Sequence, residues 1–147
     1  MEAAILDTTV LIDYLRREPT PEAIEVFQEI KSGRLTGKTT SISAFEVYWG
    51  AELSPNSKER LAEAEALLDV LPCLPVDEAA ARLAAEAGVN LERRGEAIDI
   101  RDLLIGAIAK VQGLPLITAN LNHFSRIPQL RVKSPEQLLH DLRRGTK

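Results

Sequence analysis

The sequence is poor in the residues that build disulfides and zinc sites. Cys73 is its single cysteine, and His123 and His140 are its two histidines. One thiol cannot form an internal disulfide, and three soft ligands are too few for a four-ligand structural zinc site. Any metal chemistry therefore has to use oxygen ligands, and we expect the chain to work in a reducing compartment, the cytoplasm.

Long apolar runs and a strong charge bias are also missing. No stretch approaches the roughly 20 apolar residues of a membrane-spanning helix, and the N-terminus lacks the pattern of a signal peptide, so we expect no membrane partner. The 22 acidic and 18 basic residues give a net charge of −4. That balance argues against a non-specific coat on nucleic acid, but it is compatible with an enzyme that acts on nucleic acid.

What the sequence does contain is the composition of one globular domain, which we expect to span residues 1–147. Hydrophobic residues make up 45% of the chain and charged residues 27%. A chain of this length buries roughly 70% of its unfolded surface, which is enough for a core without disulfides.

Strand-like and helix-like segments alternate along the chain. The predicted strands cover residues 3–6, 38–42, 72–76, 114–118 and 130–132. The predicted helices cover residues 10–17, 21–33, 44–53, 57–71, 77–94, 102–112 and 135–145. This alternation predicts an α/β protein, a three-layer α/β/α sandwich with a short, mostly parallel sheet. The prolines around residues 72–76 favour an edge position for that strand.

Acidic and amide side chains follow several of these segments. Asp7 ends the first strand, Glu46 lies in the helix after the second, and Asp99 and Asp102 open the helix before the fourth strand. Asn120 comes directly after that fourth strand. Because parallel strands end at one edge of the sheet, we expect these side chains to converge there.

Each acid also has an ordinary structural explanation. Asp7 fits a helix cap, with Thr8 or Thr9 as other candidates, and Glu46 fits a capping box with Ser43. Asp99 and Asp102 fit a cap followed by an acid that the helix dipole favours. The joint pattern points further, because several carboxylates in one cleft repel unless a cation offsets them. Mg²⁺ and Mn²⁺ prefer such oxygen ligands, so the sequence predicts a divalent-metal site.

Four stretches of the chain carry a family pattern: residues 5–15, 41–50, 98–107 and 113–124. In order and spacing they resemble the PIN-domain nucleases and, within them, the VapC-type toxins of prokaryotic toxin–antitoxin pairs. The resemblance spans essentially the whole chain. It implies a compact α/β/α fold, a homodimer, Mg²⁺ or Mn²⁺ at the acidic site, and endoribonuclease activity on RNA. It also implies a VapB-type antitoxin whose tail occupies the active-site groove.

Position by position, the resemblance assigns roles to the acids. Asp7, Glu46 and Asp102 look like the family's core acidic triad, and Asp99 looks like an accessory acid of part of the family. The fourth acidic position falls in the region of Asn120. An amide carbonyl can coordinate a metal but brings no charge, so one or two metal ions both stay open.

Three further residues belong to this pattern. Thr8 and Thr118 look like the hydroxyl positions that orient metal-bound water or ligands. His123 stands where the family has an acid. We expect Asp7 and Asp102 to hold the metal, with Glu46 close to it and Asn120 as a further ligand. Asp99 or Glu46 is then the residue that orients or deprotonates the attacking water.

The chain also offers candidate contacts for partners. The arginines that could contact RNA are Arg16, Arg17, Arg93, Arg94 and Arg126, although for each of them an ordinary surface position is the stronger interpretation. Tyr48 and Trp49, with apolar helices between residues 11 and 71, could form a groove for an antitoxin helix, or could simply pack in the core.

Two other classes of protein share some of these features. A phosphoacceptor signalling domain is disfavoured, because Asp7 is the only acid at the end of the first strand and no lysine follows Thr118. A non-catalytic PIN-like binding module with a degenerate acidic site is the main alternative. Asn120 and His123 favour it, whereas the presence of all three core acids argues against it.

Overall fold

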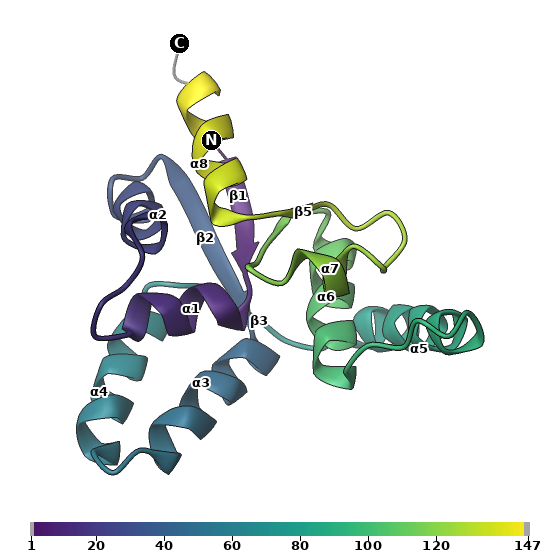
Figure 1. Ribbon diagram of the computed structural model, residues 1–147, viewed down its shortest axis with the longest axis horizontal. Helices are drawn as coiled ribbons and strands as arrows, with labels where there is room; N and C mark the ends of the chain where they lie inside the picture. The colour runs from purple at the N-terminus through teal and green to yellow at the C-terminus, as the bar shows by residue number, and fades with distance from the viewer. Residues whose placement is uncertain (1, 146–147) are drawn as a thin grey trace.

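Five strands form one sheet at the centre of the structure (Figure 1). The computed structural model describes residues 2–145. The strands are β1 (Glu2–Leu6), β2 (Leu35–Thr40), β3 (Cys73–Leu74), β4 (Leu116–Ile117) and β5 (Val132–Lys133), in the order β3-β2-β1-β4-β5. Every neighbouring pair runs parallel, and β3 lies at an edge. The predicted parallel sheet and the edge position of the third strand are confirmed.

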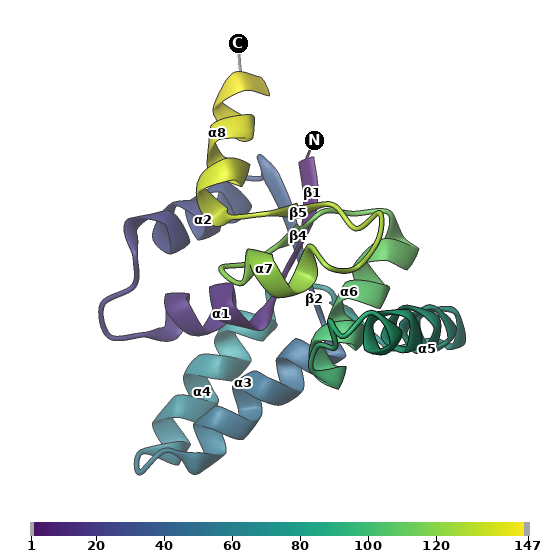
Figure 2. The ribbon, with the colours of Figure 1, turned by 45° about the vertical axis from the view of Figure 1, so that its right-hand side comes forward.

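Helices cover both faces of this sheet (Figures 1 and 2). They are α1 (Thr8–Leu15), α2 (Pro21–Lys31), α3 (Ser41–Leu53), α4 (Ser57–Leu68), α5 (Glu78–Arg93), α6 (Ile100–Gln112), α7 (Leu121–Phe124) and α8 (Pro135–Gly145). Among residues 2–145, no helix is long and apolar enough to cross a membrane.

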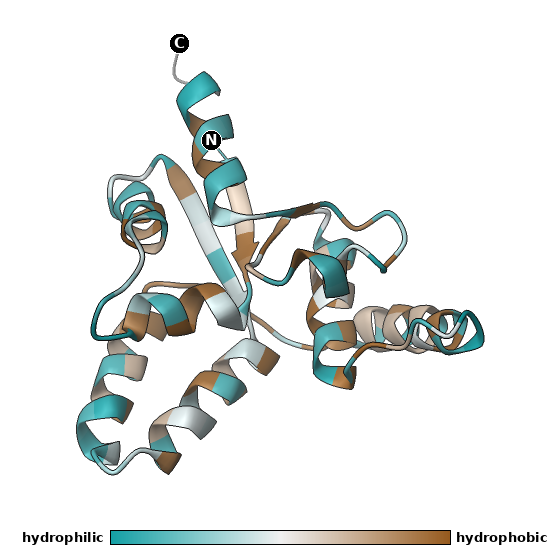
Figure 3. Ribbon diagram, viewed as in Figure 1, coloured by the Kyte–Doolittle hydropathy of each residue, from teal (hydrophilic) through white to brown (hydrophobic). Residues whose placement is uncertain are grey.

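The two faces carry separate hydrophobic cores. In β1, Ala4 and Leu6 pack into one cluster with residues of α1, α2, α3, α4 and α8, whereas Ile5 packs into the other with residues of α5 and α6. This alternation follows from the two-residue period of a strand. Figure 3 shows the hydrophobic colour of the residues at the end of β1. With helices packed on both faces of the sheet, the predicted three-layer α/β/α sandwich is confirmed.

Strand β2 begins at Leu35, three residues before its predicted start. The sequence around Gly37 suggests a turn, but the glycine serves close packing inside the strand. A Cβ atom at Gly37 would lie 2.6 Å from Cδ1 of Ile30 and 3.2 Å from Cδ2 of Leu71. The missing side chain therefore lets α2 and the segment before β3 approach the strand, which the local sequence does not reveal.

The cap of one helix agrees with a predicted candidate and that of another does not. Asp7, one of the candidates, is the N-cap of α1, whereas α3 begins at Ser41 with Thr40, rather than Ser43, as its N-cap. The Thr40 hydroxyl accepts the Ser43 backbone N–H at 3.0 Å, so Ser43 already lies inside the first turn. The predicted capping box is therefore wrong, and the side chains of Ser43 and Glu46 are available for other contacts.

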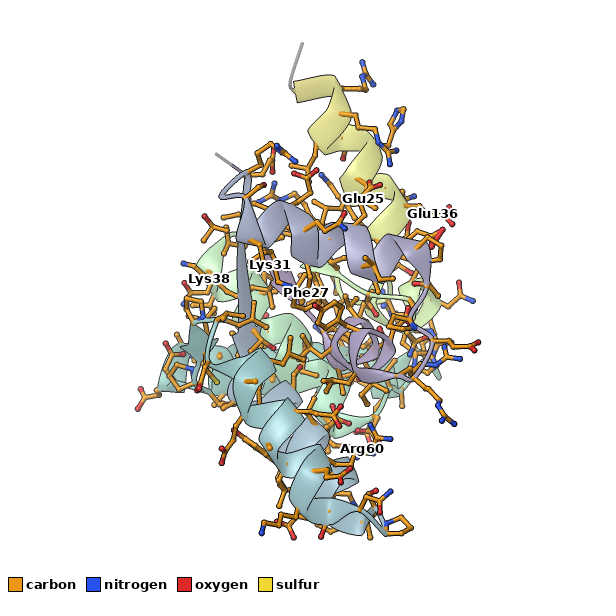
Figure 4. The ribbon with its side chains drawn as sticks, turned by 90° about the vertical axis from the view of Figure 1, so that its left-hand side faces the viewer. Glu25, Phe27, Lys31, Lys38, Arg60 and Glu136 are labelled. Carbon is orange, nitrogen blue, oxygen red and sulfur yellow. The ribbon has the colours of Figure 1, made fainter. Side chains whose placement is uncertain are left out.

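The short helix α7 was not predicted from the sequence. Residues 121–124, expected as a polar loop, form the short helix α7, which is anchored because Phe124 is buried in the core beside α6. Helix α8 packs against α2, where Arg143 donates to Glu25 at 2.6 Å. Figure 4 shows Phe27 pointing from α2 toward α1, where its ring stacks on Tyr14 with centroids 4.0 Å apart.

Candidate active site

A cleft of about 460 Å³ opens at the edge of the sheet where the strands end. Its walls include the carboxylates of Asp7, Glu46 and Asp102, the amide of Asn120 and the guanidinium of Arg16. Chemistry in open parallel sheets takes place at this carboxyl-terminal edge. The structure therefore brings together the three predicted core acids and the predicted amide.

Asp7 sits at the bottom of the cleft with only 2% of its surface exposed. One carboxylate oxygen accepts the backbone N–H of Thr9, and the other accepts the hydroxyl of the fully buried Thr118. Burial raises the pKa of Asp7 to about 6, because loss of solvation outweighs these two hydrogen bonds. The protein thus holds an acid where its charge is costly unless a cation is nearby.

Glu46 is held by a chain of hydroxyl groups. The Thr8 hydroxyl donates to Oε1 of Glu46 at 2.7 Å and lies 3.0 Å from Oγ of Ser43. Ser43 Oγ in turn lies 3.2 Å from the Thr40 hydroxyl, the cap of the same helix. This series of hydroxyl groups can form because α3 begins three residues earlier than predicted. It connects Glu46 to Thr40 at the end of β2 and so holds the glutamate side chain in place.

Asp102 lies in the first turn of α6 and is half-buried. Burial raises its pKa, although His123 opposes that rise. Nδ1 of His123 lies 3.5 Å from Oδ2 of Asp102 and 2.8 Å from Nδ2 of Asn120. The His123 imidazole therefore lies between Asn120, the fourth predicted position, and Asp102, one of the three core acids. In the family pattern an acid stands where this chain has His123.

Asp99 lies beside the cleft rather than in its wall. It is the N-cap of α6, accepting the backbone N–H of Arg101 at 2.8 Å. Its carboxylate also faces Nε and Nη2 of Arg101 at 3.1 and 3.3 Å, which lowers the pKa of Asp99. Arg101 was not predicted from the sequence to be a site residue. Its position between Asp99 and Asp102 is the signal that could have indicated it.

The oxygen donors in the cleft suit a hard divalent ion. Among residues 2–145, no three His, Cys, Asp or Glu side chains stand close enough to hold one ion jointly. The carboxylates of Asp7, Glu46 and Asp102 and the carbonyl of Asn120 nevertheless share one cleft wall. Mg²⁺ and Mn²⁺ prefer oxygen ligands and Mg²⁺ keeps several waters, so this donor set fits such an ion with few direct protein ligands.

The predicted partner contacts are only partly placed near the cleft. Arg16 lines it, whereas Arg94 and Arg126 donate to backbone carbonyls of residues 126 and 97. Arg17 lines an adjoining groove of about 290 Å³ between α1, α3 and α4, and Arg93 ends α5. A groove does lie between these helices, but neither of the two aromatic residues predicted to line it, Tyr48 and Trp49, belongs to its walls.

Comparison with known proteins agrees with this geometry. The PIN domain family model matches residues 4–130. Ribonuclease VapC2 of Haemophilus influenzae is 30% identical, with 88% of this chain and 96% of the relative covered. The tRNA(fMet)-specific endonuclease VapC of Salmonella typhimurium is also 30% identical, covering 88% and 95%. DNA-bound VapBC from Salmonella typhimurium superposes with a TM-score of 0.82 at 30% identity, covering 92% of this chain and 99% of the other. The chain therefore belongs to the PIN-domain family and, within it, to the VapC ribonucleases, as its sequence predicted.

Proposed function

We propose that this protein is a Mg²⁺- or Mn²⁺-dependent endoribonuclease that hydrolyses RNA phosphodiester bonds, the toxin of a toxin–antitoxin pair. The observation that carries the proposal is the convergence of Asp7, Glu46 and Asp102 on one cleft at the carboxyl-terminal edge of the sheet. Membership in the VapC ribonucleases supports both the activity and the class of partner.

In this proposal Asp7 and Asp102 would hold the ion, partly through water, with Glu46 close to it and the carbonyl of Asn120 as a further ligand. When bound, the ion supplies Lewis-acid polarisation of the phosphate and lowers the pKa of a water. The Thr118 hydroxyl and the Thr9 backbone N–H keep the Asp7 carboxylate aimed into the cleft.

Glu46 is the better candidate for orienting and deprotonating the attacking water. It lies in the cleft wall, held by Thr8, whereas both oxygens of Asp99 face Arg101. The water oxygen joins phosphorus and one of its protons passes to the Glu46 carboxylate. The bond from phosphorus to the 3′ oxygen breaks, and the 3′ oxygen takes up a proton from solvent water. The products are a 5′-phosphate and a 3′-hydroxyl.

The groove beside the cleft supports the antitoxin as a partner. It shares Ile12, Arg16 and Glu46 with the cleft, and its remaining walls combine apolar residues of α1, α3 and α4 with the polar side chains of Arg17, Ser54, Arg60 and Glu63. An amphipathic antitoxin helix in this groove would lead directly to the acidic site. We further propose a homodimer, supported by the exposed aromatic pair Phe45 and Trp49 on α3, and a cytoplasmic location, where the RNA substrate is found.

A non-catalytic PIN-like module with a degenerate site is the second candidate. The observation that favours it is the presence of Asn120 and His123 where the family pattern has acids. Such a module would keep the fold and the partner groove but would not cut RNA.

The test is incubation of purified protein with total cellular RNA in Mn²⁺ or in EDTA, followed by sequencing of the new ends. We expect cutting in Mn²⁺ alone, with 5′-phosphate ends. Ends that carry a 2′,3′-cyclic phosphate would contradict the water mechanism. Absence of cutting together with absence of Mn²⁺ binding in calorimetry would favour the non-catalytic module.

A further inference from the structure

One guanidinium bridges α3 and α6 at the rim of the cleft. Nη1 of Arg101 lies 3.5 Å from Oε2 of Glu46, while Nε and Nη2 face the two oxygens of Asp99. Asp99 is itself fixed, because its Oδ1 accepts the Arg101 backbone N–H as the cap of α6. Asp99, which lies outside the cleft, thus orients Arg101 toward Glu46, which lies in the cleft wall.

This arrangement leaves hydrogen-bond donors of Arg101 unused. A guanidinium has five N–H donors, and Asp99 occupies one on Nε and one on Nη2. The distance to Glu46 exceeds the usual range for an N–H···O hydrogen bond, and 52% of the arginine side chain is exposed. Asp99 therefore leaves three of the five N–H groups, two on Nη1 and one on Nη2, in the planar arrangement that binds phosphate oxygens in pairs.

The cleft needs positive charge that its own walls hardly provide. The described wall residues include four acids, Asp7, Asp13, Glu46 and Asp102, and one basic residue, Arg16 on α1. RNA is a polyanion, so its approach to these acids is opposed unless cations flank the path. Arg101 supplies such a cation from a second element, α6, next to one of the acids.

We infer that Arg101 binds a phosphate of the RNA strand next to the scissile bond, and that Asp99 is a positioning residue that acts through Arg101. The inference rests on the proposed endoribonuclease function and specifies how that site grips its substrate. It also separates Asp99 from the chemistry at the water, because neither of its oxygens is directed into the cleft.

The test uses the variants Arg101→Gln, Arg101→Lys, Asp99→Asn and the double variant Asp99→Asn/Arg101→Gln. Asparagine keeps the helix cap and Arg101 is half-exposed, so the folds should persist, which circular dichroism checks. The matched control is Arg34→Gln. Arg34 pairs with Glu29 through the same two kinds of nitrogen, at the opposite, amino-terminal end of β2.

Binding is measured by anisotropy of fluorescein-labelled single-stranded RNA of mixed sequence in Ca²⁺, with the strand checked for integrity on a gel. We expect Arg101→Gln to weaken binding about tenfold and to lower the slope of log Kd against log salt by about 0.7, the share of one phosphate contact. Arg101→Lys should keep the slope, because the charge remains, and should recover part of the affinity. Arg34→Gln should change neither quantity.

Kinetics on an RNA that the wild type cuts then separate Arg101 from Asp99. We expect Arg101→Gln to raise KM about tenfold with kcat within about twofold, and Asp99→Asn to raise KM about threefold. In the double variant, Asp99→Asn should add nothing to the effect of Arg101→Gln.

Three results would overturn the inference. Unchanged Kd, KM and salt slope in Arg101→Gln, while the wild type still cuts RNA, would reject it and leave the proposed function standing. A fall in kcat on adding Asp99→Asn to Arg101→Gln would place Asp99 in the chemistry instead. Wild-type protein that neither binds nor cuts RNA would reject the proposed function and this inference together.

Discussion

Replacing Asp7 by asparagine should stabilise the metal-free protein while removing its activity. The folded protein holds the pKa of Asp7 at about 6, against 3.8 for the free side chain. Since the folded form binds the proton more tightly, Asp7 opposes folding by an amount that grows as the pH rises from about 3.8 to about 6 and is constant above that range, so stability rises as the pH falls through it. Asparagine removes this opposing charge at every pH.

The size of the effect follows from the two pKa values. Relative to low pH, the linkage relation gives a destabilisation from the raised pKa of Asp7 of about 3 kcal/mol at pH 7.5 and about 1.6 kcal/mol at pH 5. An amide accepts hydrogen bonds through one oxygen rather than two, so the contact with Thr118 weakens at a cost of about 1 kcal/mol. We therefore expect Asp7→Asn to exceed the wild type by about 2 kcal/mol at pH 7.5 and by less than about 1 kcal/mol at pH 5.

The assay is urea unfolding in EDTA at both pH values, followed by circular dichroism. Asp77→Asn is the control, because Asp77 is likewise an N-cap aspartate, on α5, but is exposed. It should leave stability nearly unchanged at both pH values. A less stable Asp7→Asn protein at pH 7.5, or a gain over wild type that is the same at pH 5, would refute the reasoning that burial of this charge opposes folding.

Three further predictions follow from the same site and core. Mn²⁺ at about 100 times its Kd should stabilise the wild type by about 2.7 kcal/mol in thermal unfolding, and Asp7→Asn much less. Thr8→Val, which removes the 2.7 Å hydrogen bond to Glu46, should lower kcat in an RNA-cleavage assay about 10-fold or more, while circular dichroism shows an intact fold. Gly106→Ala should destabilise the protein by about 1–3 kcal/mol in urea unfolding, because its Cβ would lie 2.4 Å from a packed isoleucine, whereas Gly50→Ala, with nothing within 4 Å, should be neutral or stabilising.

Local sequence signals were sufficient for the layout of the fold. The alternation of short apolar runs with amphipathic segments predicted the parallel sheet and its two helical layers, and Asp77 marked the start of α5 because its carboxylate caps the helix within three residues. The same locality explains why Asp7, Glu46 and Asp102 could be assigned to one cleft, since each lies at a strand end or near the start of a helix.

Features that depend on tertiary packing were not visible in the sequence. The early start of β2 depends on Ile30 filling the space beside Gly37, and the start of α3 depends on which of two hydroxyl residues, Thr40 or Ser43, caps the helix. The link from Arg101 to Glu46 joins residues 55 positions apart and exists only because α3 and α6 meet at the cleft.

Cleavage of total cellular RNA by wild type and by Asp7→Asn, side by side in Mn²⁺, tests the central claim most directly. Asparagine keeps the shape of the buried side chain and the helix cap but removes the charge that the metal needs, so the account predicts cutting by the wild type and none by the folded variant. Equal cutting by both proteins would contradict the account, because it would place the nuclease activity somewhere other than the Asp7, Glu46 and Asp102 cleft.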